Sequence, residues 1–343
     1  MRMTPALVIV GALLVFWCSV GIAVLLPAFT MTEEKSEIWR EWSADERAGH
    51  DLYVKNGCSY CHTQFVRNTD QDAQRLAQRG DYVGMKPVIL GTERTGPDLS
   101  QNGGEHPDDW HIAHFYNPRS TRPMSLMPSW EFLGEKKVRQ LTAYMQAMGG
   151  TDADRRMSDD PNAPGQRYWK RQAQRAYAAG PDENIHWLHS KVPAPWRPMP
   201  NPYHATPAAL ERGKLIYQRY CINCHGPVGD GQGSATKHLS PPPLNFTTLR
   251  GHLVKGEVDG KRYDYIGGIF YYQIMHGITG TAMPYFKREL ESEKIWDVSN
   301  YIAVYFVGYS DAGLPPSGIG VSYQSPWANP YATPPATQRS SQP

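Results

Sequence analysis

Cys58-Ser59-Tyr60-Cys61-His62 is repeated in kind by Cys221-Ile222-Asn223-Cys224-His225, and these two pentapeptides decide the fold of the chain. C-x-x-C-H is the attachment signature of haem c. Two thiols one helical turn apart add to the two vinyl groups of a haem, and the adjacent His then lies under the iron as an axial ligand. We therefore expect two covalently bound haem c groups, one on Cys58 and Cys61 and one on Cys221 and Cys224, with His62 and His225 as iron ligands.

Two other uses of paired cysteines compete with this interpretation. They are a thioredoxin-like redox pair and half of a zinc site. Neither requires a His directly after the second Cys. The fifth cysteine, Cys18, stands alone in an apolar run, so the scattered pattern of a disulfide framework is absent from the sequence.

A Met on the opposite side of the iron is expected where a haem is an electron carrier of raised potential. In the first half of the chain, Arg122–Pro128 (RPMSLMP) offers Met124 and Met127. In the second half, Gly280–Pro284 (GTAMP) offers Met283. A Met-Pro pair lies shortly before a closing helix in both halves, and we take Met127 and Met283 as the ligands. The alternative for each Met is a core filler without a ligand role.

A proline-containing loop follows each motif, as Gly96-Pro97-Asp98-Leu99 and as Pro242-Pro243-Leu244. An iron-bound His needs its other ring nitrogen held by an acceptor, which is often a backbone carbonyl. We expect Pro97 and Pro242 to supply that carbonyl. Leu99 and Leu244 are expected to pack on the haem face.

The N-terminal stretch Ala6–Leu26 carries no charge and is long enough to span a bilayer as a helix. Arg2 precedes it, and Glu33 and Glu34 follow, so the positive end is expected to stay inside. A cleaved signal peptide is the competing interpretation, although the run is long and no A-x-A-like site follows it. Residues 1–31 are therefore expected to be a single-pass anchor in the cytoplasmic membrane of a bacterium, with the haem domains on the periplasmic side.

The remaining sequence predicts a mostly helical protein with two small all-α cytochrome c domains. A helix precedes each C-x-x-C-H motif, at 44–57 and 206–220, and no strand pattern of any length appears. The connecting segment contains one short predicted helix at 166–179 and a Pro-rich end. The expected segments are the anchor (1–31), the first domain (44–149), the linker (150–204), the second domain (205–311) and a Pro/Ser-rich tail (312–343), extended or disordered.

An amphipathic helix is predicted to close each domain. In the first, Val138, Leu141 and Met145 share one face. In the second, the shared face is formed by Ile295, Val298, Ile302 and Tyr305. The two halves thus repeat one plan of helix, haem motif, proline loop, Met-Pro and helix.

Two further features restrict the function. The formal net charge of +2 implies neither nucleic acid nor a strongly anionic partner. His111 and His114 lie in DDWHIAHF, about one turn apart on a predicted helix. They are candidates for a metal site or for contacts with haem propionates, and a polar helix face without a ligand role is the alternative.

Residues 5–149 resemble the membrane-anchored monohaem cytochrome c subunit of cbb3-type (C-family) haem-copper oxidases. The matching stretches are the anchor, NGCSYCHTQFVR (56–67), GTERTGPDLSQNGGEHPDDWHIAHFYNPRS (91–120) and SLMPSWEFL (125–133). In that family the iron ligands are the motif His and the Met of S-x-M-P. The resemblance therefore implies His62 and Met127 rather than Met124. Residues 205–310 are similar, more weakly, to a general class I cytochrome c domain through CHGPVGDGQG, PPPLNF and the Met-Pro ending.

The resemblance implies a non-catalytic dihaem subunit that passes electrons to a catalytic haem-copper membrane subunit in a respiratory chain. Another cytochrome c or a quinol-oxidising complex would be the electron donor. Three alternatives stay open: the cytochrome c subunit of a nitric oxide reductase-like complex, a stand-alone membrane-anchored dihaem carrier, and a dihaem peroxidase. The last predicts that one domain lacks its Met, whereas each half of this sequence has one.

Overall fold

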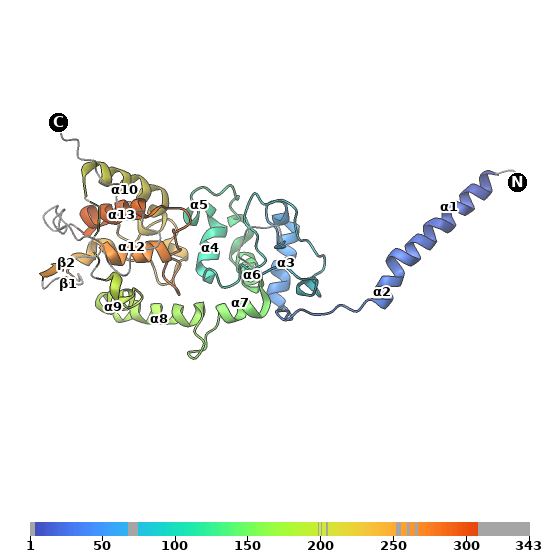
Figure 1. Cartoon of the computed structure of the whole chain (residues 1–343), viewed down its shortest axis with the longest axis horizontal. Coiled ribbons are helices and arrows are strands. Elements are labelled where there is room, and N and C mark those ends of the chain that lie inside the picture. The colour runs from blue at the N-terminus through green and yellow to red at the C-terminus, as the bar shows by residue number, and fades with distance from the viewer. Residues whose placement is uncertain are drawn as a thin grey trace, which may run out of the picture.

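The computed structural model describes residues 4–67, 75–197, 199, 201–203, 205–251, 255–258, 261–264 and 267–307. Its N-terminal helix α1 (Pro5–Val20) continues through a π-helical turn (Gly21–Leu25) into α2 (Leu26–Thr30). Thr4 caps the start, and Pro5 occupies the first turn, where a missing N–H costs nothing. The 26-residue rod is long and apolar enough to cross a membrane, and none of it is buried by the rest of the chain. It stands apart from the other helices (Figure 1).

The first helical domain is built on the crossing of α3 (Ala44–Lys55) with α6 (Gly134–Ala147). Ser43 and Glu46 form a capping box that starts α3. The helices touch closely because α3 has a glycine at the crossing, where a Cβ on Gly49 would lie 2.1 Å from the carbonyl oxygen of Gln140. Two short helices, α4 (Asp108–Tyr116) and α5 (Pro118–Thr121), complete this domain.

The second helical domain repeats this crossing with α10 (Pro207–Tyr220) and α13 (Ser292–Ile302). Gly213 is the counterpart of Gly49, since a Cβ there would lie 2.2 Å from the carbonyl oxygen of Asp297. The predicted cap of Thr206 with Pro207 in the first turn is present. The remaining helices of this domain are α11 (Ile222–His225) and α12 (Gly267–His276).

The segment between the domains is more helical than expected. The predicted helix at 166–179 is present as α8 (Gln166–Ala179), and α7 (Gly150–Arg156) and α9 (Pro181–Ser190) flank it. Gln166 ties both domains together: its amide nitrogen donates to Gly104 O (3.4 Å), and its amide oxygen accepts from Gly280 N (2.9 Å). This segment therefore lies along both domains as a packed helical layer (Figure 1).

The mostly helical fold class is confirmed, with one correction. Strands β1 (Lys255–Val258) and β2 (Lys261–Asp264) pair in antiparallel register as a small hairpin, with Lys255 opposite Asp264. The expectation of no strands was therefore wrong here. The signal lay in the sequence, because Asp259-Gly260 is a strong hairpin dipeptide. The remaining short elements are 3₁₀ turns at Cys58–Tyr60, Arg79–Tyr82, Glu131–Leu133, Ala194–Trp196, Thr236–His238 and Phe246–Gly251.

The closing helices bury the predicted faces except at one residue. Val138, Leu141 and Met145 are buried in the first domain, as are Ile295, Val298 and Ile302 in the second. Tyr305 was expected on the same face, but it is 61% exposed. The α-helix ends at Ile302 and continues as a π-helical turn, Ala303–Val307, whose wider turn shifts the phase of the side chains. Ala303 and Val307 point inward instead, and the predicted tail at 312–343 lies outside the described residues.

Candidate haem sites

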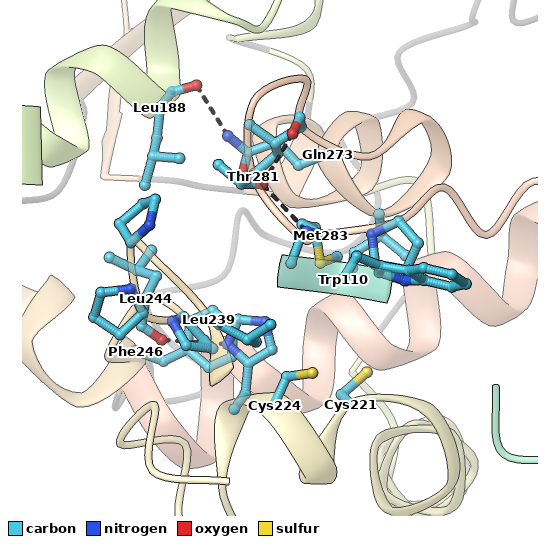
Figure 2. Close-up of a pocket in the computed structure, with 18 of the residues that line it drawn as sticks. Trp110, Leu188, Cys221, Cys224, Leu239, Leu244, Phe246, Gln273, Thr281 and Met283 are labelled. Carbon is cyan, nitrogen blue, oxygen red and sulfur yellow. Dashed lines mark hydrogen bonds between the residues drawn. The ribbon is translucent and has the colours of Figure 1, made fainter. Parts of the chain in front are cut away.

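A mainly apolar cavity, open to solvent at its mouth, lies over the second C-x-x-C-H motif. Cys221 and Cys224 lie on one side of it, and Met283 lies across from them (Figure 2). His225 also lines the cavity. The rest of the wall is mainly apolar and includes Leu239, Leu244, Phe246, Phe270, Ile274 and Ile302.

The local fold places the three motif side chains on one helical turn. Cys221 ends α10 and starts α11, and His225 N donates to Cys221 O at 2.9 Å. Gly226, with φ +79°, then turns the chain sharply away. Its carbonyl is held by the buried Tyr217 hydroxyl at 2.6 Å. The motif therefore forms a sharp turn at the end of α10, and the hydrogen bond from Tyr217 fixes its shape.

The imidazole of His225 is fixed by the loop that follows the motif. Its Nδ1 lies 3.2 Å from Leu244 O, and the Phe246 ring stacks on it at 4.5 Å between centroids. A carbonyl can only accept, so Nδ1 carries the proton and Nε2 keeps its lone pair. The expectation that Pro242 supplies this carbonyl was wrong. Pro242 lines the cavity, but the stack with Phe246 brings the later part of the loop alongside the ring.

The first motif has the same arrangement with a different loop. His62 Nδ1 lies 2.8 Å from Pro97 O, the predicted partner. The loop can approach this closely because residue 96 is glycine, where a Cβ would lie 2.3 Å from the His62 ring. Leu99 is buried in the core cluster against which Cys58 and Met127 pack. At the first site the structure thus pairs His62 with Pro97 and gathers Leu99, Cys58 and Met127 in one core cluster.

Asp98 is the member of the first site that the sequence reasoning missed. Its buried carboxylate accepts from the Thr63 hydroxyl (2.5 Å) and from Phe65 N (2.8 Å). It also accepts from Ser100 N at 2.9 Å and pairs with Arg94 at 3.3 Å. These contacts connect the loop that contains Pro97 to the segment that follows His62. Asp98 lies within the Gly-Pro-Asp-Leu motif, between the two residues for which a role was predicted.

Both candidate Met residues are held by the same local contact. Met127 N donates to the Ser125 hydroxyl, and Met283 N donates to the Thr281 hydroxyl, each at 3.2 Å. A hydroxyl two residues before the Met thus orders the loop in both S-x-M-P and T-x-M-P. Met124 is 68% exposed, and its sulfur accepts from Arg219. The geometry therefore favours Met127 over Met124 at the first site.

The protonation states suit iron ligation better than thiol redox chemistry. Burial raises the pKa of Cys58 and Cys224 to about 11 and that of Cys221 to about 12. A redox C-x-x-C pair needs the opposite, a thiol pKa below the usual value. Burial lowers the pKa of His225 to about 4, so its imidazole is neutral and able to bind a metal at neutral pH.

His111 and His114 do not form a metal site with neighbours. No group of three or more His, Cys, Asp or Glu side chains suited to a metal ion occurs in the part of the chain that the structure describes. His111 is 3% exposed, and His114 Nδ1 pairs with the Thr121 hydroxyl at 2.7 Å. The alternative, a helix face without a ligand role, fits these contacts, although both imidazoles are buried rather than solvated.

The residues present fit a covalently bound haem. Each site presents two cysteines, an imidazole whose Nδ1 is held by a carbonyl, and a Met on a proline-stiffened loop. Such a haem, once bound, supplies an iron that changes charge by one electron. In the second site the mainly apolar wall would limit the access of water to it, and Cys221, Cys224 and Met283 line the same cavity (Figure 2).

This helical fold, with its C-x-x-C-H motifs and loop Met residues, defines a c-type cytochrome that carries electrons. Residues 1–182 match the family described as the mono-haem subunit of cytochrome c oxidase, FixO. This match covers more than half of the chain, so the chain belongs to that family. Residues 208–302 also match the family described as subunit III of cbb3-type cytochrome c oxidase.

Comparisons with individual proteins add little. None of the curated proteins matches the chain. A solved structure of the reducing HAO-like protein complex of Kuenenia stuttgartiensis is 18% identical and covers 78% of this chain and 98% of that one. Its TM-score is 0.24, which carries no argument about fold or function.

Proposed function

We propose that this chain binds two haem c groups and delivers electrons to the catalytic haem-copper subunit of a cbb3-type oxidase. The family match over residues 1–182 carries the proposal, because the matched family is that of an oxidase subunit. Both halves also contain the full set of thiols, imidazole and Met. His62 and Met127 bind the first iron, and His225 and Met283 bind the second. The chain itself reduces no oxygen.

We place the second domain at the electron entry and the first domain at the exit. The first domain follows the membrane helix directly and belongs to the part of the chain matched by the oxidase subunit family. Its partner is the catalytic subunit in the same membrane. Another cytochrome c or a quinol-oxidising complex supplies electrons to the second domain. The charge order around the helix supports a periplasmic position for both domains.

Purification of the intact complex from membranes tests this function. The full chain, carrying an affinity tag after Pro343, is extracted in mild detergent and its haem and metal content is measured. Haem b and copper are expected to co-purify in fixed ratio to the chain. Purification of the chain alone would favour a stand-alone carrier and contradict the proposal. Haem b without copper would contradict it as well, in favour of the nitric oxide reductase-like alternative.

A further inference from the structure

Helix α4 of the first domain has two apolar faces, and one of them belongs to the first haem site. Phe115 is buried in the first core cluster, and Ile112 and Tyr116 pack against it. Cys58 and Met127 pack on the same cluster. This face of α4 therefore lies on the core that holds the first haem's thiol and its Met.

The other face of α4 belongs to the second haem site. Ala113 is 1% exposed and lies in a cluster with Leu239, against which Cys224 packs. Trp110 lines the second cavity, as does Met283 (Figure 2). Ser120 and Thr121 of α5 also line it. The second cavity is thus closed by side chains that come from the first domain.

Polar contacts hold the two domains in this position. Asp109 on α4 pairs with Lys170 (2.7 Å) and accepts from Ser240 N (2.9 Å). Arg122 pairs with Glu289 across the same boundary. Further cross-boundary contacts include the stack of Tyr116 on His238 at 4.2 Å and the donation of Asn223 Nδ2 to Arg119 O at 3.3 Å.

We propose that α4 is a wall shared by both haem sites, with Trp110 and Ala113 acting as members of the second site. The two sites are then held at a fixed separation of about one helix diameter, about 10–12 Å with side chains. The rate of electron tunnelling falls steeply with distance. Because this separation is short and fixed, an electron crosses from one site to the other without domain movement. One iron loses the electron that the other gains, and no bond or proton changes place.

The side chains of α4 suit this role. Ala113 is small, so the helix backbone approaches the wall that contains Cys224. The Trp110 ring is stacked between His106, at 3.8 Å between centroids, and His114, at 4.9 Å. Both stacks are nearly parallel, at 18° and 7°. Trp110 is therefore fixed in orientation and keeps water from its side of the cavity.

The separation of the two sites is measured directly in the full-length oxidised protein. Pulsed electron paramagnetic resonance reports the distance between two ferric haems. The proposal rests on both haems of the proposed function being bound, but it needs no oxidase partner, so the two ideas fail in different experiments. A single narrow and short distance is expected. A broad or long distribution would show that the second domain moves as a tethered carrier and would overturn the proposal.

Two variants test the residues, with a third as a matched control. Ala113→Leu is expected to lengthen the distance and to slow electron redistribution between the haems after flash photoreduction by tenfold or more. Trp110→Ala is expected to lower the reduction potential of the second haem only, because water then reaches its pocket. Trp187→Ala opens the same cavity from α9, on a wall that the first domain does not form.

The control separates the effect of Ala113→Leu, on the wall shared by both sites, from the effect of opening a wall that borders the second site alone. Trp187→Ala is expected to shift the second potential while leaving the haem–haem distance as it is in the unmodified chain. In the unmodified chain the redistribution rate is expected to be independent of solvent viscosity. A rate that falls with added glycerol, or an Ala113→Leu protein with unchanged distance and rate, would overturn the proposal.

Discussion

At the scale of single residues, each site depends on a carbonyl that holds an imidazole in one tautomer. Pro97 serves His62, and Leu244 serves His225. In both cases the proton sits on Nδ1, and the lone pair of Nε2 is free to bind the iron of the proposed haem. The proposed ligand on the opposite side of each iron is the Met of the loop, Met127 or Met283.

Replacing Met127 and Met283 separately with Ala tests that assignment. Each variant is expected to lose the visible and magnetic signature of His–Met ligation at one of its two haems, because the sulfur ligand is removed. Met124→Ala is the matched control, since its sulfur lies outside the core, and it is expected to keep both signatures. Retention of two His–Met signatures in either ligand variant would eliminate that Met as a ligand.

Asp98 gives a second prediction at this scale. Asp98→Ala removes the buried acceptor of the Thr63 hydroxyl and of two backbone N–H groups, together with the ion pair to Arg94. Loss of a buried, hydrogen-bonded carboxylate is expected to lower the free energy of unfolding by about 2–4 kcal/mol. Urea denaturation of the haem-loaded protein measures this. Asp51→Ala, at an exposed carboxylate on α3, is expected to change it by less than about 0.5 kcal/mol, and equal effects at both positions would contradict the account.

At the scale of elements, glycines set how closely the paired helices cross. A Cβ on Gly49 or on Gly213 would collide with a carbonyl of the facing helix. Gly49→Ala and Gly213→Ala are therefore expected to destabilise the protein by about 1–3 kcal/mol, although Ala is the better helix former. Thermal unfolding checks this. Lys214→Ala, on the exposed face of α10, is the control, and a stabilised Gly213→Ala protein would show that the crossing is looser than described.

Helix α4 predicts how stability depends on pH. Burial lowers the pKa of His111 to about 4, against about 6.5 when unfolded. Between these values the unfolded chain binds more protons, so stability is lost as the pH falls from about 6.5 to about 4, by at most about 3 kcal/mol from this residue. His111→Phe keeps an aromatic ring beside Trp110 and is expected to flatten that slope. His186→Phe, at an exposed position of α9, is expected to keep it; an unchanged slope in His111→Phe would refute the prediction.

At the scale of the whole molecule, much of the fold could be predicted from the sequence because the same order of motifs occurs in both halves. The two C-x-x-C-H motifs, the Met-Pro loops, the apolar N-terminal helix and α8 are local patterns, and each is encoded by neighbouring residues. Tyr305 and the choice between Pro242 and Leu244 depend on the phase of a π-helical turn and on a stacking partner, so local pattern did not reveal them. The strand pair at 255–258 and 261–264 was not predicted, although the sequence between the strands, Asp-Gly, is a dipeptide typical of hairpins.

The relation between the two domains was the least predictable part. The sequence around Trp110 and Ala113 predicts an ordinary helix, because nothing in its spacing shows that a second domain packs on it. Leu239, more than a hundred residues later in the chain, packs with Ala113 and lines the same cavity as Trp110. The linker was predicted from its prolines, yet Gln166 contacts both domains. Contacts of this range follow from packing and not from local sequence.

The central claim is that one chain carries two haem c groups, one in each half. Mass spectrometry of the chain isolated from membranes tests it most directly. The mass of the intact chain is measured first, and the chain is then digested and its peptides are analysed. The account predicts a mass increase of two haems, with one haem on the peptide containing Cys58 and Cys61 and one on that containing Cys221 and Cys224. A chain with a single haem, or with a free C-x-x-C-H peptide, would contradict it.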